Sequence, residues 1–208
     1  MNITILGTGH VGGALTRGFL KAGHQVTVAA ANPEHAAALA QQTGARSAAS
    51  NIEAVQDAEI VVLAVPRSAL AQVADEIAEV VKGKIVVDVT NNMNADLTSR
   101  TSERSKAEEL QERLSGTAVI KAFNTVFAAR QADPVIDGIA LDGFYAGDDE
   151  TAKETVAGVL EGLGYRPIDA GPLRMARALE EMGLLHIRLN AVNGWPWMTG
   201  WKLLGPTK

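Results

Sequence analysis

The feature that constrains the fold most is a glycine-rich turn near the N-terminus, Gly7-Thr8-Gly9-His10-Val11-Gly12. It follows a short apolar run from Ile3 to Leu6, which predicts a buried strand, and precedes apolar residues at helical spacing up to Ala22. In such a unit the first glycine allows a tight turn, the second lets a phosphate approach the backbone, and the third lets helix and strand pack closely. The helix N-terminus then presents amides to an anion. The pattern predicts a dinucleotide site, the alternative being a glycine turn kept for packing.

Strand and helix patterns alternate through the first 125 residues, and each helix is followed by another apolar strand. Alternation of this kind is typical of a Rossmann-type α/β fold, a doubly wound parallel sheet with helices on both faces. Ser105 and Glu108 form a capping-box signature for one of these helices. The predicted strands are 25–29, 60–65, 85–89 and 118–122, and the predicted helices begin at 33 and cover 69–81 and 105–114.

The last third of the chain has a weaker pattern, with strands predicted at 143–146 and 166–168 and helices at 150–163 and 173–192. We expect the doubly wound sheet to end at the strand 118–122. The expected organisation is therefore a dinucleotide-binding domain at 1–125 and a small C-terminal α/β subdomain, 126–208, packed on it.

Composition excludes several classes of function. The net charge of −5 leaves no basic stripe for nucleic acid, and the absence of cysteine removes thiolate sites and thiol nucleophiles. The four histidines have no ligand-like spacing, so no metal site is predicted. The longest apolar run, Ala58 to Pro66, is far shorter than the roughly 20 residues that span a bilayer, and no signal-peptide pattern precedes the first strand. We expect a cytoplasmic protein with small-molecule partners.

The remaining cofactor-binding candidates lie where predicted strands end, because the carboxyl ends of parallel strands line the crevice that holds the ligand. They are Ala30, Ala31 and Asn32 after the second strand, then Ala64, Val65 and Pro66, and finally Asn91. Core packing for Val65 and simple strand termination for Pro66 are the alternatives. The second strand ends without the acid that binds a ribose 2′-hydroxyl and without the arginine that binds a 2′-phosphate. The motif alone therefore leaves NADP and NAD both open.

No serine–histidine–acid arrangement and no pair of carboxylates stands out, so no protein catalytic residue is predicted. Hydride transfer between two bound cofactors needs none, because the protein only aligns the rings and excludes water. His186 is expected to be a satisfied core or interface histidine. The tryptophans Trp195, Trp197 and Trp201 are expected at an interface or the core, the alternative being a wall for a cofactor ring. The polar stretch 91–104 is expected to be a mobile lid or a partly disordered loop.

These residues resemble the NADPH-dependent reductases of coenzyme F-420, a deazaflavin, and more distantly the reductase domain of the STEAP metalloreductases. The resemblance extends over nearly the whole chain. It rests on the glycine turn and on Ala64-Val65-Pro66, Asp88-Val89-Thr90-Asn91, Glu103-Arg104-Ser105, Lys121-Ala122-Phe123-Asn124-Thr125, Asp169-Ala170-Gly171-Pro172-Leu173, Ala176-Arg177 and Leu179-Glu180.

The resemblance implies an oxidoreductase that passes hydride between NADP(H) and coenzyme F-420 or a flavin, with the second ring near Phe123, Asn124 and Thr125. It also implies a homodimer. For Asn124 the alternative is a turn-capping side chain. For Lys121 the alternative to direct ligand contact is a surface charge at a strand end.

One departure concerns the 2′-phosphate, which the family usually clamps with Ser-Arg where this chain has Ala30 and Ala31. A charge-assisted contact of that kind is worth about 1.5–3 kcal/mol. Arg67 is a candidate replacement, with ordinary surface placement as the alternative. Two other functions stay open: a reductase of a small organic substrate, and a sensor that binds the dinucleotide without turnover.

Overall fold

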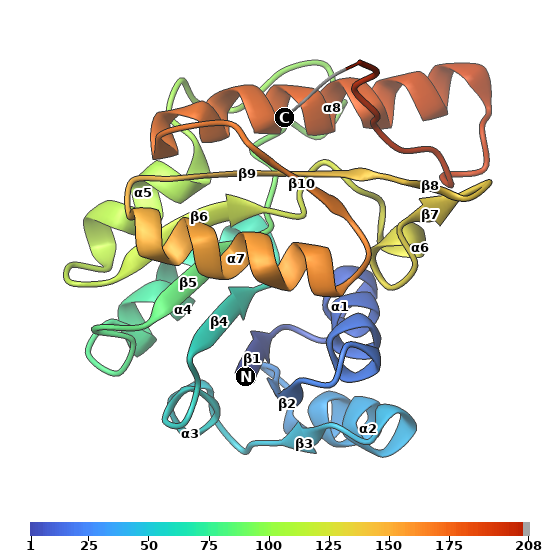
Figure 1. Cartoon of the computed structure of the whole chain (residues 1–208). Helices are drawn as coiled ribbons and strands as arrows, with labels where there is room; N and C mark the ends of the chain where they lie inside the picture. The colour runs from blue at the N-terminus through green and yellow to red at the C-terminus, as the bar shows by residue number, and fades with distance from the viewer. Residues whose placement is uncertain (206–208) are drawn as a thin grey trace.

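The molecule is built on a single sheet of eight strands (Figure 1). The computed structural model describes residues 1–205 of the chain. The strand order is β10-β9-β6-β5-β4-β1-β2-β3. Its strands are β1 (Asn2–Leu6), β2 (Gln25–Ala29), β3 (Arg46–Ser47), β4 (Ile60–Leu63), β5 (Ile85–Asp88), β6 (Ala118–Ala122), β9 (Asp142–Gly147) and β10 (Arg166–Asp169). The six strands from β1 to β6 pair in parallel, as the alternation of strands and helices predicts.

The sheet does not end at β6, and this part of the sequence prediction was wrong. β9 pairs antiparallel with β6 and parallel with β10, so both C-terminal strands extend the same sheet. The physical reason is that β6 would otherwise present an unpaired edge beside a buried core. A separate hairpin of β7 (Val135–Ile136) and β8 (Ile139–Ala140), which the sequence analysis did not predict, precedes β9.

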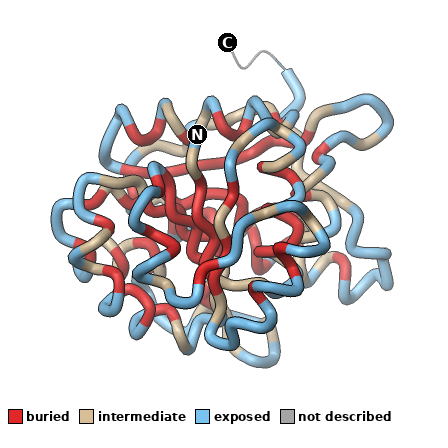
Figure 2. The backbone as a smooth tube through the Cα atoms, turned by 90° about the horizontal axis from the view of Figure 1, so that it is seen from below, coloured by how far each residue is buried: buried red, intermediate tan, exposed pale blue. Residues whose placement is uncertain are grey.

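Helices cover both faces of the sheet and make a three-layer arrangement (Figure 1). One face is covered by α1 (His10–Lys21), α2 (Pro33–Thr43) and α7 (Glu150–Gly162), and the other by α3 (Asn51–Val55), α4 (Leu70–Ile77), α5 (Lys106–Arg113) and α8 (Ala176–Asn193). Shorter turns are α6 (Ala128–Gln131), η1 (Arg67–Ala69) and η2 (Leu173–Met175). Figure 2 shows the central strands as the most deeply buried part of the chain, so the sheet is a rigid platform for the loops at its edge.

Helix and strand ends follow local chemistry. The predicted capping box is present, since the Ser105 side chain accepts from the Glu108 amide and the Glu108 carboxylate accepts from the Ser105 amide. α8 ends at Gly194, which adopts the left-handed conformation (φ 63°) that glycine tolerates best. β4 ends at Leu63, two residues earlier than predicted, so Val65 and Pro66 belong to the loop above the strand. No helix among residues 1–205 is long and apolar enough to cross a membrane.

Candidate functional site

The glycine turn joins β1 to α1 and divides into two packing positions and one open position. A Cβ on Gly7 would lie 2.3 Å from the Ala64 carbonyl oxygen, and one on Gly12 would lie 1.9 Å from the Gly7 carbonyl oxygen. Gly7 also has a φ of 109°, which side chains rarely adopt. At Gly9, by contrast, nothing lies within 4 Å of the Cβ position. The turn therefore holds strand and helix together at its ends and leaves its middle open to a ligand.

The N-terminus of α1 rises directly from this open position. Gly9 is the N-cap, no side chain caps the helix, and its first turn carries no acidic residue. The first amides of a helix have no partner within the helix, and the helix dipole adds a partial positive charge there. This end of α1 is therefore suited to a phosphate group that approaches across Gly9.

A cleft of about 630 Å³ opens beside the turn, at the carboxyl ends of β1, β2 and β4. It brings together seven predicted cofactor-binding residues: Gly7, Thr8, Ala30, Ala31, Asn32, Val65 and Pro66. Strands β2 and β4 are the two neighbours of β1 in the sheet, which is why residues so far apart in sequence line one cleft. The cleft is the position in which an open α/β sheet binds its ligand.

The other predicted residues lie around this cleft rather than in its lining. Gly9 and His10 line a neighbouring hollow, shared with Thr8, between α1, α2 and α6. Gly12 and Ala64 pack beneath the turn, where their Cβ positions would be 3.5 Å apart, and Val11 is half-buried against the core. Asn91 follows β5 on the opposite side of β4 from the cleft.

Sequence reasoning missed most of the outer wall of the cleft. That wall consists of Ala49, Ser50, Asn51, Ala69, Gln72, Val73 and Glu76. Residues 49–51 follow β3, a two-residue strand too short to be recognised from its pattern, and the others lie on η1 and α4. The sequence signal that could have found Ser50 is that of a helix N-cap, because its side chain caps α3 by accepting from the Glu53 amide.

Asn91 and Asn124 form a reciprocal pair at the ends of β5 and β6. The Asn124 amide Nδ2 donates to Asn91 Oδ1 (2.8 Å) and to the Leu179 carbonyl (2.8 Å), while Asn91 Nδ2 donates to the Asn124 carbonyl (3.1 Å). Gly183 of α8 packs closely against the pair, since a Cβ at this position would lie 2.6 Å from Asn91 Oδ1. The Asn124 Oδ1 atom is buried without a hydrogen-bond partner.

The structure places Phe123 and Thr125 inside the protein. The Phe123 ring makes T-shaped contacts with Phe19 and Tyr165, with ring centroids 5.9 and 6.1 Å away, and because Phe123 is only 2% exposed it presents no face to a ligand. The Thr125 carbonyl accepts a hydrogen bond from His186 Nδ1 (3.0 Å). A second ring bound near residues 123–125 stays a prediction, and in this arrangement a stacking surface would have to come from other side chains.

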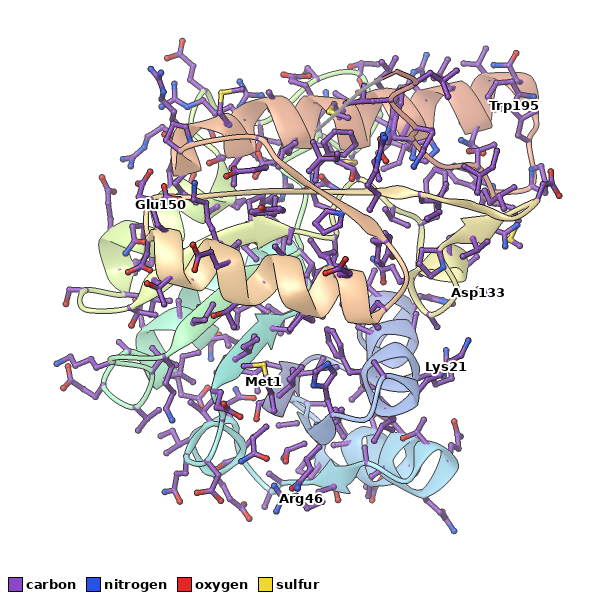
Figure 3. The ribbon with its side chains drawn as sticks, viewed as in Figure 1. Met1, Lys21, Arg46, Asp133, Glu150 and Trp195 are labelled. Atoms are coloured by element: carbon purple, nitrogen blue, oxygen red, sulfur yellow. The ribbon has the colours of Figure 1, made fainter. Side chains whose placement is uncertain are left out.

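His186 is buried and satisfied, as predicted. Its Nε2 lies 2.8 Å from the Thr199 hydroxyl, which ties the C-terminal tail to α8. Burial lowers the pKa of His186. Phe127 stacks on the imidazole, with centroids 4.1 Å apart, and Trp201 packs beside it at 5.3 Å. Trp195, labelled in Figure 3, lies at the exposed end of α8.

Lys121 is neither a surface charge nor exposed to a ligand, so both interpretations of it were wrong. It is fully buried, and its ammonium donates to Asp88 Oδ2 (2.8 Å), to Glu180 Oε1 (2.9 Å) and to the Thr90 carbonyl. Burial disfavours the charged ammonium, but Asp88 and Glu180 outweigh burial and raise the pKa of Lys121. Burial also raises the pKa of Glu180, whose Oε2 has no partner. The cluster joins β5, β6 and α8 directly beneath the Asn91–Asn124 pair.

The stretch 91–104 has no helix or strand, and side chains hold it in place. Asn92 Nδ2 donates to Ser102 Oγ (2.7 Å), and Arg100 pairs with Glu181 of α8 (2.7 Å). Arg67 donates to the Met93 carbonyl (2.6 Å) and to the Thr101 hydroxyl (3.1 Å). Arg67 therefore anchors this stretch and is not among the residues that line the cleft.

Comparison with known proteins agrees with this arrangement. The family model described as "NADP oxidoreductase coenzyme F420-dependent" matches residues 2–92. The F420-dependent NADP reductase of Methanothermobacter marburgensis is 30% identical to this chain, and the alignment covers 93% of the chain and 94% of that protein. The chain belongs to the F420-dependent NADP reductase family.

Two further relatives show how far this family resemblance extends. A solved structure from Arthrobacter, provisionally described as an F420-dependent NADP reductase, superposes on this chain with a TM-score of 0.88 at 28% identity. The superposition covers 99% of this chain and 100% of the Arthrobacter chain. The rat metalloreductase STEAP3 is 34% identical over 88% of this chain, although the match covers only 36% of STEAP3. The chain is thus an oxidoreductase of the F420-dependent NADP reductase family over essentially its whole length.

Proposed function

We propose that this chain transfers hydride between a nicotinamide dinucleotide and coenzyme F-420 or a flavin. The dinucleotide is NADP(H) in the named relatives, and both NADP(H) and NAD(H) are considered for this chain. When bound, the two cofactors would supply the chemistry, a hydride from the reduced nicotinamide and, on the acceptor ring, the place where that hydride and one proton from the medium are taken up. The protein's part is to bind both molecules, align their rings and exclude water.

The single observation that carries the proposal is the open position at Gly9 between two closed positions, Gly7 and Gly12. A turn kept only for packing has no reason to leave its middle residue without contacts while an uncapped helix N-terminus faces the same space. The cleft beside it then accepts the adenosine half of a dinucleotide. We propose that the pyrophosphate lies over Thr8, Gly9, His10 and Val11, and the adenosine between Ala30, Ala31, Asn32, Val65 and Pro66.

The nicotinamide would then extend over the ends of β4, β5 and β6, toward Ala64 and Asn91. We propose that Asn91 and Asn124 act there as positioning residues, because each fixes the other's amide and α8 holds both. The Asn124 Oδ1 atom has no partner, so we propose it as the acceptor for an N–H of the carboxamide or of a ring. The second ring would bind on the outer side of this pair, near residues 123–125.

Turnover with defined acceptors tests the proposal. Purified protein is incubated anaerobically with NADPH and, separately, NADH, and coenzyme F-420, FAD, FMN and riboflavin are offered in turn while nicotinamide absorbance is followed. We expect turnover with coenzyme F-420, and its loss in a Gly9→Ala variant. Activity with flavins alone would make the chain a flavin reductase. Dinucleotide binding without any turnover would favour a sensor and contradict the proposal.

We also propose a cytoplasmic homodimer formed by the C-terminal part of α8 and the tail that follows it. This end of the molecule exposes several large apolar side chains: Leu185, Val192, Trp195, Trp197 and Met198. Surfaces of this kind are typical of subunit interfaces. Light scattering after size exclusion should give the mass of a dimer, and Leu185→Lys/Val192→Lys should give that of a monomer. A wild-type monomer would contradict the proposal.

A further inference from the structure

The cleft beside the glycine turn has a distinct chemistry at the end of β2. In dinucleotide-binding sheets this is where the adenosine ribose lies, and a 2′-phosphate there needs a cation or several donors. Ala30 and Ala31 occupy the two positions after β2, half-buried and exposed respectively, and both line the cleft. Neither side chain can donate a hydrogen bond. The position that most directly faces a 2′-substituent is therefore apolar.

The rest of the lining does not compensate for the missing charge. No lysine or arginine is among the fifteen described residues that line the cleft, and His35 is the one side chain of that lining able to become cationic. The opposite wall instead carries a carboxylate, since Glu76 accepts a hydrogen bond from Asn51 Nδ2 at 2.9 Å. A phosphate dianion would thus enter a cleft whose fixed charge is negative, which disfavours it.

The start of α2 does not offer an anion site either. Its first residue, Pro33, has no N–H, and the next amide, that of Glu34, is taken by the Asn32 side chain at 3.0 Å. Glu34 in the first turn also offsets the positive end of the helix dipole. The helix terminus nearest β2 is therefore already satisfied and neutralised by its own sequence.

The arginines closest in sequence to the cleft have other positions. Arg67 is bound to the Met93 carbonyl and Thr101. Arg17 lines the hollow on the other side of the turn, between α1 and α2. Arg46, labelled in Figure 3, lines a crevice at the amino ends of β1 and β2, with Asn2 and Thr27. Each would have to leave its observed place to reach a 2′-phosphate.

We propose that this chain uses NAD(H) in preference to NADP(H), because its adenosine site has no lysine or arginine to clamp a 2′-phosphate and carries the Glu76 carboxylate. The inference rests on the dinucleotide site of the proposed function and names the ligand of that site. It does not depend on which ring accepts the hydride.

Binding of the adenosine halves tests the inference without any catalysis. Calorimetry with AMP and with adenosine 2′,5′-bisphosphate, and then with NADH and NADPH, gives the cost of the 2′-phosphate for the fragment and for the whole cofactor. We expect the 2′-hydroxyl member of each pair to bind more tightly. Tighter binding of adenosine 2′,5′-bisphosphate and NADPH would overturn the inference.

A gain-of-function variant locates the effect. Ala30→Ser/Ala31→Arg should tighten NADPH binding relative to NADH binding by about ten- to a hundredfold, the range expected for a new charge-assisted contact. The matched control is Gln41→Arg alone, which adds the same charge to an exposed position two turns into α2, outside the cleft lining, and should leave both affinities unchanged. Equal gains in the two variants would show a long-range charge effect and contradict the assignment to Ala31.

The two proposals fail in different ways. If the chain binds NADH tightly but passes hydride to no deazaflavin or flavin, the proposed function fails and the preference for NAD(H) stands. If turnover with coenzyme F-420 is faster with NADPH than with NADH, in agreement with tighter NADPH binding, the preference fails and the proposed function stands.

Discussion

Asp88 and Lys121 are register partners on β5 and β6, and Lys121 Nζ lies 2.8 Å from Asp88 Oδ2 with both side chains fully buried. Glu180 of α8 meets the same ammonium from above, at 2.9 Å. Its Oε1 also accepts from the Lys106 amide at the start of α5 (2.9 Å). One lysine therefore connects two central strands with two helices, close to the edge where the cofactors are proposed to meet.

Removal of this lysine should destabilise the fold severely. Lys121→Met leaves Asp88 and Glu180 buried without their cation, and loss of one partner of a buried ion pair typically costs about 3–5 kcal/mol. Urea unfolding measures the free energy of unfolding. The control is Lys82→Met, which breaks an exposed pair with Glu79 and should cost at most about 1 kcal/mol. An equal loss of unfolding free energy in the two variants would mean that the buried cluster stabilises the fold no more than an exposed ion pair does.

Two substitutions in the glycine turn should have different effects, one on stability and the other on dinucleotide binding. Gly12→Ala places a Cβ against the Gly7 carbonyl and should destabilise the protein by about 1–3 kcal/mol or more. Gly9→Ala meets nothing in the protein and should cost about 1 kcal/mol or less, yet weaken dinucleotide binding at least about tenfold, because the methyl group occupies the place of the phosphate. Thermal unfolding and calorimetry measure the two effects. A Gly9→Ala variant with unchanged affinity would count against a pyrophosphate at this turn.

Acid stability should depend on the pair between α5 and α8. The Arg177 guanidinium binds both oxygens of Glu108 (2.7 and 2.9 Å) and, as the main cause, lowers the pKa of Glu108 to about 2. Because the folded-state pKa is below the unfolded value of about 4.3, the contribution is full above that value and is lost as the pH falls toward 2. Arg177→Gln should therefore lessen the fall in unfolding free energy between pH 6 and pH 3.

The size of this effect is limited by solvent, since the Arg177 side chain is 46% exposed. We expect a difference of at most about 1 kcal/mol after screening. Arg113→Gln, which removes a pair with Asp75 that is exposed on both sides, is the control and should leave the pH profile unchanged. Identical profiles for wild type and Arg177→Gln would show that the pair does not act through Glu108.

The C-terminal tail should detach when Thr199 loses its hydroxyl. Thr199→Val leaves His186 Nε2 and Asn190 Oδ1 without a partner inside the protein, at a cost of about 1–3 kcal/mol. We expect a red shift in tryptophan emission, because Trp201 packs against His186. Thr155→Val, which removes only a bond to the Thr151 carbonyl within α7, should change neither quantity. An unshifted emission spectrum would mean that other contacts hold the tail.

The sequence by itself determined the features that depend on neighbours along the chain. The glycine turn, the parallel strands β1, β2, β4, β5 and β6, the capping box at Ser105 and the end of α8 all follow from local periodicity and backbone preference. The positions of Ala30, Ala31, Val65 and Pro66 in one cleft also followed, because the carboxyl ends of parallel strands meet at one edge. The sequence therefore predicted which residues line the candidate site wherever those residues follow a strand end.

Tertiary structure decided what distant segments do to one another. Lys121 and Glu180 are 59 residues apart, and nothing local indicates that the lysine is buried between two carboxylates. The same holds for β9, whose antiparallel pairing depends on a free edge, and for Asn51 and Glu76, which meet only when α3 and α4 pack side by side. Such contacts depend on how whole elements pack against one another, and hydrophobic periodicity specifies which face of an element is buried without specifying its partner.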